Sequence, residues 1–167
     1  MAYERVIPDP GFADDDGTAP ADVVAALAAY DEAPEALHAP TLALLQETRV
    51  LVPVMAVLGE VELDEHGLAH DKTSDMATVL ITGRDGRTAL LAFTSTASLT
   101  AWNKQARPVA VELRKAALSA IQDGADALVI DIAGPVLFAV EGPELRSLAE
   151  GLVLQRVDAG WGWTRPM

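Results

Sequence analysis

The sequence predicts an α+β (mixed α/β) fold in which a single mixed β-sheet carries helices packed on it. Half of the 167 residues are apolar and 22% are charged, a balance typical of a globular chain. Helical periodicity and strand-like runs follow one another along the chain, as in domains that layer helices on a sheet. Asp85-Gly86 between two β-rich runs indicates a β-hairpin. The length fits one domain with short extra segments.

The N-terminal part predicts an arm followed by two helices. Residues 1–17 are rich in Asp, Pro and Gly, so we expect a flexible arm. Val23, Leu27 and Tyr30 then recur at helical spacing. After an interruption by two prolines, a second short helix is expected to end near Thr48.

The middle of the chain predicts the sheet. The run "RVLVPVMAVL", residues 49–58, is apolar and β-rich and predicts a buried strand. Pro53 within it favours an edge position or a bulge, because proline lacks the N–H that a central strand donates. The runs "MATVLITG" and "RTALLAFT" flank Asp85-Gly86 and predict the two arms of the hairpin.

The C-terminal part predicts alternating helices and strands. "LRKAALSAIQDG" has the apolar stripe of a helix, "ALVIDI" and "VLFAV" are strand-like, and "GPELRSLAEGL" predicts another helix. We therefore assign residues 18–157 to one domain and residues 158–167 to a C-terminal tail. Trp161 and Trp163 in that tail are expected to fold back onto the domain or to cross to a second subunit of a homodimer.

Composition and charge narrow the function classes. The chain has no cysteine, which excludes disulfides, thiolate metal sites and cysteine catalysis. Its 25 acidic against 12 basic residues give a formal charge of −13, so we expect neither nucleic acid nor membrane partners. The start lacks the pattern of a signal peptide, and no apolar run approaches the roughly 20 residues of a membrane helix. A cytoplasmic location is expected.

The stretch "LLAFTSTASLTAW" changes from strand-like to helical where its hydroxyl groups lie. Thr94, Ser95 and Thr96 follow the apolar run that ends at Phe93. Hydroxyl and free N–H groups at the start of a helix are a common place for a bound anion. A single hydroxyl there is also an ordinary helix cap. Both interpretations stay open.

Other segments are expected near the same corner. Trp102 with Arg107-Pro108 either forms a shelf for a partner or anchors the helix to the sheet. Asp131 ends a strand, where its carboxylate either accepts turn N–H groups or faces a ligand. The candidate ligand or partner residues are accordingly those at the predicted corner: Phe93, Thr94, Ser95, Thr96, Trp102, Arg107, Pro108 and Asp131.

No catalytic residue, metal site or cofactor is predicted. The acidic loop "GEVELDEHGLAHD" offers carboxylates and imidazoles, namely Glu60, Glu62, Asp64, Glu65, His66, His70 and Asp71. Its two histidines are four residues apart, but a glycine between them favours a turn, and the helical His-Glu-x-x-His pattern is missing. A triad of Ser95, a histidine and Asp131 lacks the Gly-x-Ser-x-Gly elbow.

Several of these segments together resemble the SseB N-terminal domain family in its actinobacterial form. The resemblance covers residues 23–148 and depends on "AFTS" followed by Leu and Trp, then Arg-Pro, then "D-x-AGP". Two positions depart from the pattern, since Ile132 and Ala110 stand where the family commonly has proline. The resemblance implies a domain without an established biochemical activity.

We therefore expect a non-enzymatic binding or regulatory module that recognises a protein, a peptide or a small anion at the strand-to-helix corner. One alternative is an enzyme acting on a small anionic or amino-acid-like substrate there. A second alternative is a structural subunit of a homo-oligomer. A strongly shifted titratable group in a closed pocket would favour the enzyme. A large symmetric apolar interface over the corner would favour the structural subunit.

Overall fold

The computed structural model describes residues 12, 14–57, 62–63, 69–70 and 75–166. Within these residues the chain has the predicted α+β fold. The predicted arm, residues 1–17, and the acidic loop fall mostly outside the described residues. Of the loop, the structure describes only a two-residue ladder between β2 (Glu62–Leu63) and β3 (Ala69–His70).

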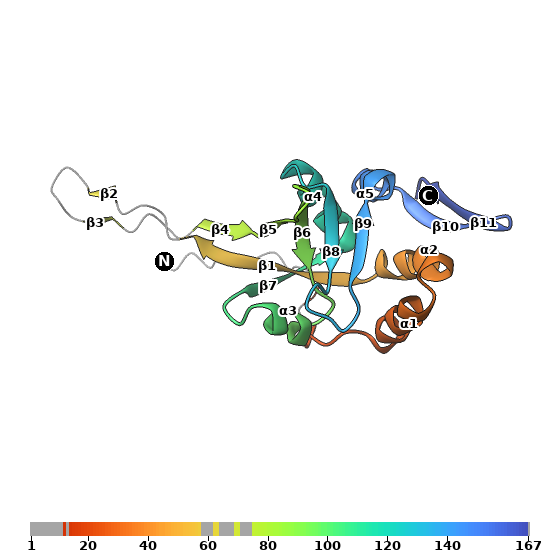
Figure 1. Cartoon of the computed structure of the whole chain (residues 1–167), viewed down its shortest axis with the longest axis horizontal. Helices are drawn as coiled ribbons and strands as arrows, with labels where there is room; N and C mark the ends of the chain where they lie inside the picture. The colour runs from red at the N-terminus through yellow and green to blue at the C-terminus, as the bar shows by residue number, and fades with distance from the viewer. Residues whose placement is uncertain (1–11, 13, 58–61, 64–68, 71–74, 167) are drawn as a thin grey trace, which may run out of the picture.

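Two helices in contact with each other precede the strands. Helix α1 (Ala21–Glu32) and helix α2 (Pro34–Leu45) lie side by side at one end of the molecule (Figure 1). Pro34 occupies the first turn of α2, where its missing N–H has no helical partner to lose. Val23 and Leu27 of α1 are buried, as the helical spacing of the sequence predicts.

The strands form two principal ladders in place of the single sheet that we expected. The first has the order β4-β1-β7, with β1 (Arg49–Val57) between β4 (Asp75–Thr78) and β7 (Arg107–Glu112), all antiparallel. The second has the order β5-β6-β8-β9, with strands at Leu80–Thr82, Thr88–Ala92, Ala127–Ile130 and Phe138–Glu141. Of its three pairings, only β6–β8 is parallel.

The two ladders meet through Leu51 and Phe93. Each of these residues donates its backbone N–H to the other's carbonyl, at 2.7 and 2.8 Å. The predicted hairpin is confirmed, because β5 and β6 pair across the turn that contains Asp85-Gly86. Gly86 has a positive φ of 82°, a conformation that glycine adopts without steric cost.

Pro53 lies in the central strand of its ladder, so our expectation of an edge position was wrong. Leu51 directs its N–H and C=O toward Phe93, and backbone groups alternate in direction along a strand. The backbone nitrogen and carbonyl of Pro53 therefore also point away from β7, toward the break between β4 and β5. At that break the Val79 carbonyl accepts the Leu91 N–H of β6 and not a bond from β1. The missing N–H of proline costs no ladder bond at this junction.

Apolar side chains pack on both faces of the sheet. Along β6, Leu90 and Ala92 join a large cluster, whereas Leu91 and Phe93 join a smaller one on the opposite face. Successive strand residues point to opposite faces, so a strand covered on both sides is a continuous apolar run. This explains the unbroken "LLAF" of the sequence.

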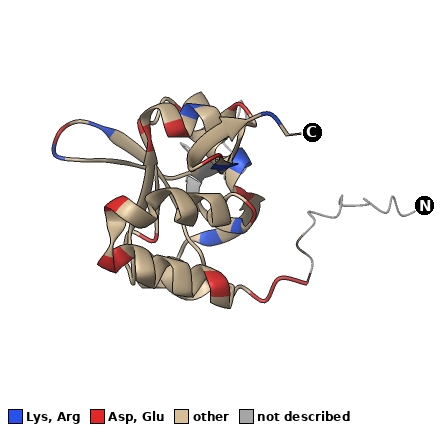
Figure 2. Cartoon of the chain, turned by 90° about the vertical axis from the view of Figure 1, so that its right-hand side faces the viewer, with Lys and Arg blue, Asp and Glu red and all other residues tan. Residues whose placement is uncertain are grey.

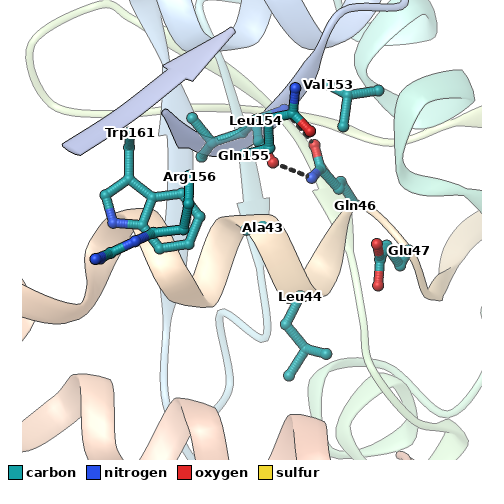
Figure 3. Close-up of a pocket in the computed structure, with 9 residues that line it drawn as sticks. All are labelled: Ala43, Leu44, Gln46, Glu47, Val153, Leu154, Gln155, Arg156 and Trp161. Atoms are coloured by element: carbon teal, nitrogen blue, oxygen red, sulfur yellow. Dashed lines mark hydrogen bonds between the residues drawn. The ribbon is translucent and has the colours of Figure 1, made fainter. Parts of the chain in front are cut away.

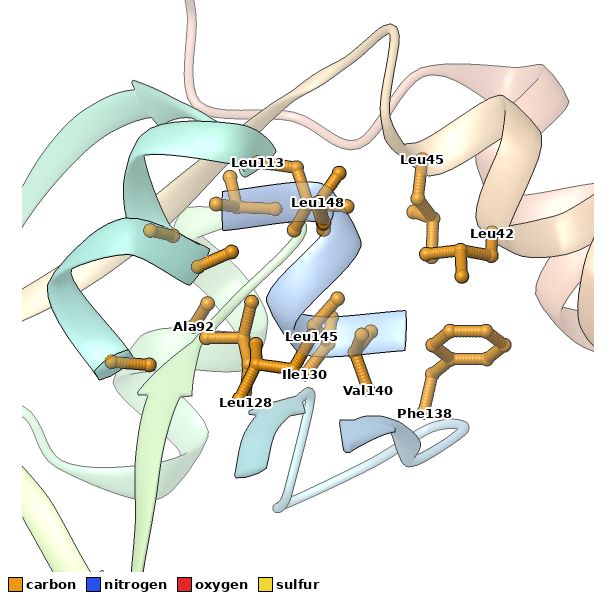
Figure 4. Packing of buried hydrophobic residues seen from close by; sticks show 14 of the residues in the cluster. Leu42, Leu45, Ala92, Leu113, Leu128, Ile130, Phe138, Val140, Leu145 and Leu148 are labelled. Atoms are coloured by element: carbon orange, nitrogen blue, oxygen red, sulfur yellow. The ribbon is translucent and has the colours of Figure 1, made fainter. Parts of the chain in front are cut away.

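The larger cluster is covered by helices α1, α2, α4 (Leu113–Gln122) and α5 (Gly142–Ala149). Its fully buried members, drawn in Figure 4, include Leu42, Leu113, Leu128, Phe138 and Leu145. The smaller cluster lies under α3 (Thr96–Trp102) and contains Leu51, Leu91, Phe93 and Leu99. In Figure 1, β1 crosses the domain between α4 and α5 on one side and α3 on the other.

The residues that we assigned to a tail belong to a C-terminal hairpin. Strand β10 (Val153–Val157) pairs with β11 (Gly160–Thr164), so the boundary at residue 158 falls in the turn between them. Trp161 and Trp163 are half-buried against the larger cluster of their own chain. The alternation of Trp and Gly around residue 162 was the sequence signal for this strand.

Candidate functional site

Asp131 is the centre of a buried hydrogen-bond network at the carboxyl ends of β6 and β8. Its carboxylate is 1% exposed and accepts three hydrogen bonds. Thr94 donates its N–H at 2.8 Å and its hydroxyl at 2.6 Å, and Ser98 donates its hydroxyl at 2.9 Å. β6 and β8 are parallel neighbours, which brings Thr94 and Asp131 together although they are far apart in sequence.

The backbone of Asp131 is adapted to this role. Its φ of 55° is positive, a region that Asp and Asn tolerate better than most residues. The carboxylate accepts bonds from Thr94 and Ser98, not from the turn that follows its own strand. Asp131 therefore fixes where the loop after β6 leaves the sheet. In this structure its carboxylate lies inside the domain and not on its surface.

Ser95 is the N-cap of α3. Its side chain accepts a hydrogen bond from the Ser98 N–H at 3.0 Å, and the Ser98 hydroxyl accepts one from the Ser95 N–H at 3.3 Å. This reciprocal arrangement is a capping box. The cap is thus the role that the structure gives to Ser95. Ser98, which the network requires, was not among our candidates, although its spacing of three from Ser95 was the available signal.

Arg49 holds the opposite side of the corner. Its guanidinium donates to the Thr94 carbonyl, to the Thr18 carbonyl at 2.7 Å and to both Asp15 carboxylate oxygens at 2.5 and 3.0 Å. The Arg49 side chain is only 9% exposed and that of Asp15 17%. A lone arginine at the start of a strand belongs to no motif, so local patterns offer no reason to select it.

A short acidic segment before α1 lies over the start of α3. We call residues 14–18 the strap; Figure 2 shows its acidic run leading into α1. The Gly17 carbonyl accepts the Thr96 N–H at 2.7 Å. Gly17 has a φ of 80°, and a Cβ built on it would collide with the Thr96 hydroxyl. Only glycine therefore allows the strap to approach α3 so closely.

The clamp changes the acidity of Asp15. The side-chain hydrogen bond from Arg49 is the largest cause that lowers the pKa of this carboxyl below its ordinary value. A bond from the Gly17 N–H acts in the same direction, and partial burial opposes both. The Asp15 carboxylate that contacts Arg49 is therefore held in its ionised form.

The remaining candidate residues divide between core and surface. Phe93 is fully buried, and its ring centroid lies 5.7 Å from that of Trp102. Trp102 is half-buried against the same small cluster, so it anchors α3 to the sheet. Thr96, Arg107 and Pro108 are exposed. The surface part of the corner thus consists of the outer side of α3 and the start of β7.

Charge sets this surface apart from the rest of the chain. The sequence has no acidic residue between Asp85 and Glu112, a stretch that contains Lys104 and Arg107, both of them exposed. The corner therefore lies in the least acidic segment of a strongly acidic protein.

Comparison with known proteins gives a match to one family model. The model of the SseB protein N-terminal domain matches residues 23–147, more than half of the chain. The chain belongs to the SseB family. No curated protein and no solved structure matches it. The match covers α1 to α5 and both sheet ladders, whereas the β10–β11 hairpin lies beyond it.

Besides its apolar packing, that hairpin is hydrogen-bonded to the SseB domain through a glutamine side chain. Gln46 donates to the Leu154 carbonyl at 2.6 Å and accepts the Leu154 N–H at 2.9 Å, so its amide pairs with β10 as a neighbouring strand would (Figure 3). Arg156 lies over the Trp161 ring at 5.5 Å. A hollow of about 320 Å³ lies between the end of α2 and the β10–β11 hairpin. It is lined by Ala43, Leu44, Gln46, Glu47, Val153, Leu154, Gln155, Arg156 and Trp161.

Histidine and carboxylate chemistry is not assembled at the corner. His38 pairs with Glu144 at 2.7 Å and stacks on Phe138, so it does not face Ser95 or Asp131.

The part of the chain that the structure describes has no group of three metal-ligating side chains. His66 and the other undescribed residues of the acidic loop lie outside that statement. Among the described helices, none is long and apolar enough to cross a membrane.

Proposed function

We propose that this SseB-family protein is a cytoplasmic binding or regulatory module, not an enzyme, and that it recognises a protein segment at the corner formed by α3 and β7. The observation that carries the proposal is the division of this corner into two parts. Its inner part is fixed by the saturated Asp131 network. Its outer part, on α3 and the start of β7, consists of exposed residues from a stretch of the sequence without acidic side chains, and the strap contacts the first residue of α3.

Rigid support behind an exposed surface is what recognition requires, because little ordering is then lost on binding. Catalysis requires a group that is free to take or give a proton. Ser95 is committed to the α3 cap, and Asp131 already accepts three hydrogen bonds. These commitments support binding over the alternative of an enzyme acting on a small anionic substrate.

A position-specific cross-linker tests the proposal. A photoreactive phenylalanine replaces Thr100, which is exposed one turn along α3, or Ala28, which is exposed on α1. After irradiation in the native host, we expect a specific protein adduct from position 100 and none from position 28. Equal adducts at both positions, or a dimer of this chain alone, would contradict the proposal; the dimer would favour the structural subunit.

A further inference from the structure

The strap occupies the corner as a ligand would. Its contacts to the domain are the Asp15 carboxylate on Arg49, the Thr18 carbonyl on Arg49 and the Gly17 carbonyl on the Thr96 N–H. Asp16 takes no part in them, since its carboxylate accepts bonds from Thr18 within the strap. The groups of the strap that the domain binds are therefore the Asp15 carboxylate and the backbone carbonyls of Gly17 and Thr18.

These contacts are reversible by their chemistry. Residues 14–18 read Asp-Asp-Asp-Gly-Thr and carry no apolar side chain, so these five residues bury no hydrophobic group. The apolar side chain nearest before them among the described residues is Phe12, which is half-buried and lines a hollow with Arg49 and Glu112. Hydrogen bonds and an ion pair at a surface are in exchange with water and contribute modestly to stability. Segments held in this way open at low free-energy cost.

Arg49 would need a new partner when the strap leaves. Its side chain is 9% exposed, and apart from the strap its guanidinium donates to the Thr94 carbonyl. A guanidinium in such a place is stabilised by an anion that also satisfies its N–H groups. Across the β1–β7 pairing Arg49 faces Glu112, whereas Arg107 faces Val54 at the other end of the strand. The groups that favour negative charge at this point are therefore the Arg49 guanidinium and the Thr96 N–H.

We propose that Arg49 is the centre of a site for an acidic peptide segment of a partner protein, and that the strap fills this site in cis until the partner displaces it. The inference rests on the proposed function and names its ligand chemistry. The bound strap defines the ligand: a carboxylate, a glycine two residues later with positive φ, and open carbonyls at that glycine and at the next residue.

Gly17→Val opens the site without changing Arg49. The new side chain meets Thr96 and also strains the positive φ of this position. Gly86→Val is the matched control, since Gly86 has a φ of 82° and has no atom within 4 Å of its built Cβ. Both variants therefore carry the same backbone strain, but only Gly17→Val expels the strap. Asp15→Asn releases the clamp by a second route that needs no steric clash.

The probe is a fluorescein-labelled peptide with the sequence of residues 12–19, FADDDGTA, measured by anisotropy on the full chain. Gly17→Val should bind it at least about tenfold more tightly than the wild type, because the competing strap is expelled. Asp15→Asn should bind it about two- to threefold more tightly, because the clamp is weakened by about 0.5 kcal/mol. Gly86→Val should match the wild type. Gly17→Val combined with Arg49→Met should lose the binding, and a peptide with Asn at its central Asp should bind about tenfold more weakly.

Equal peptide affinity for wild type, Gly17→Val and Asp15→Asn would overturn the inference, as would binding that persists without Arg49. If free glutamate competed at the same concentration as the peptide, the site would be one for a small carboxylate and the inference of a peptide ligand would be wrong. If Gly17→Val formed a concentration-dependent dimer in light scattering, the ligand would be a second copy of this chain and the inference of a partner protein would be wrong. Peptide binding says nothing about the Thr100 adduct, so the inference and the proposed function fail separately.

Discussion

At the scale of single residues, a buried carboxylate that is fully hydrogen-bonded connects the two sides of the corner. Asp131 receives two bonds from Thr94 and one from Ser98, and Thr94 in turn offers its carbonyl to Arg49. Residue types in the sequence pointed to Thr94 and Asp131 as neighbours of a corner. Their role as internal supports depends on the parallel pairing of β6 and β8, which no local pattern encodes.

Asp131→Ala tests this support. The substitution leaves the N–H and hydroxyl of Thr94 without an acceptor and places alanine at a positive φ, whereas the Ser98 hydroxyl still has the Ser95 carbonyl as an acceptor. We therefore expect a loss of about 3 kcal/mol in the free energy of unfolding. Urea denaturation measures it. Asp126→Ala is the control, because Asp126 is exposed and accepts one backbone N–H. Equal losses for the two variants would show that the network does not support the corner.

Asp15 makes a pH-dependent contribution. Its folded pKa is lowered by Arg49, so the stabilisation is fully present above the unfolded pKa of about 4 and is lost as the pH falls through the folded pKa. Asp15→Asn should therefore destabilise by about 0.5 kcal/mol at pH 7, and by less at pH 3. Exchange of the Thr96 amide should quicken in parallel. A pH-independent difference between wild type and variant would be inconsistent with the clamp.

At the scale of elements, turn chemistry made some parts predictable and long-range pairing hid others. The β5–β6 hairpin follows from Asp85-Gly86, and α1 and α4 follow from their apolar stripes. The C-terminal hairpin was not predicted, because its turn, Asp158-Ala159, lacks the Asn-Gly or Asp-Gly pair that usually indicates a hairpin. Asp158 instead takes the positive φ of 54°. The double ladder depends on the Leu51–Phe93 bridge, which joins residues distant in sequence.

Gln46→Leu tests the attachment of the β10–β11 hairpin. The substitution removes both bonds to the Leu154 backbone, so we expect a loss of about 1–2 kcal/mol. Amide exchange should quicken in β10 and β11 and stay unchanged in β6 and β8. Gln122→Leu, at the exposed end of α4, controls for the change of residue type. Uniform quickening throughout the chain would mean that the hairpin is part of the global folding unit.

At the scale of the whole molecule, charge distribution relates the fold to the proposed function. A chain with a formal charge of −13 has its acid-free stretch where strand meets helix, and its own acidic strap lies there. The sequence predicted the family and the fold class. It did not predict that the strap covers this corner, because Arg49, Gly17 and Thr96 come from three separate segments.

The most direct measurement is the dissociation constant of the protein captured at position 100, determined by calorimetry for three forms of the full chain. Arg107→Glu reverses a charge on the outer corner, whereas Arg146→Glu reverses an exposed charge on α5. Our account predicts that Arg107→Glu weakens binding by about tenfold or more, with Arg146→Glu close to the wild type. Equal weakening by both substitutions, or by neither, would contradict recognition at the corner of α3 and β7.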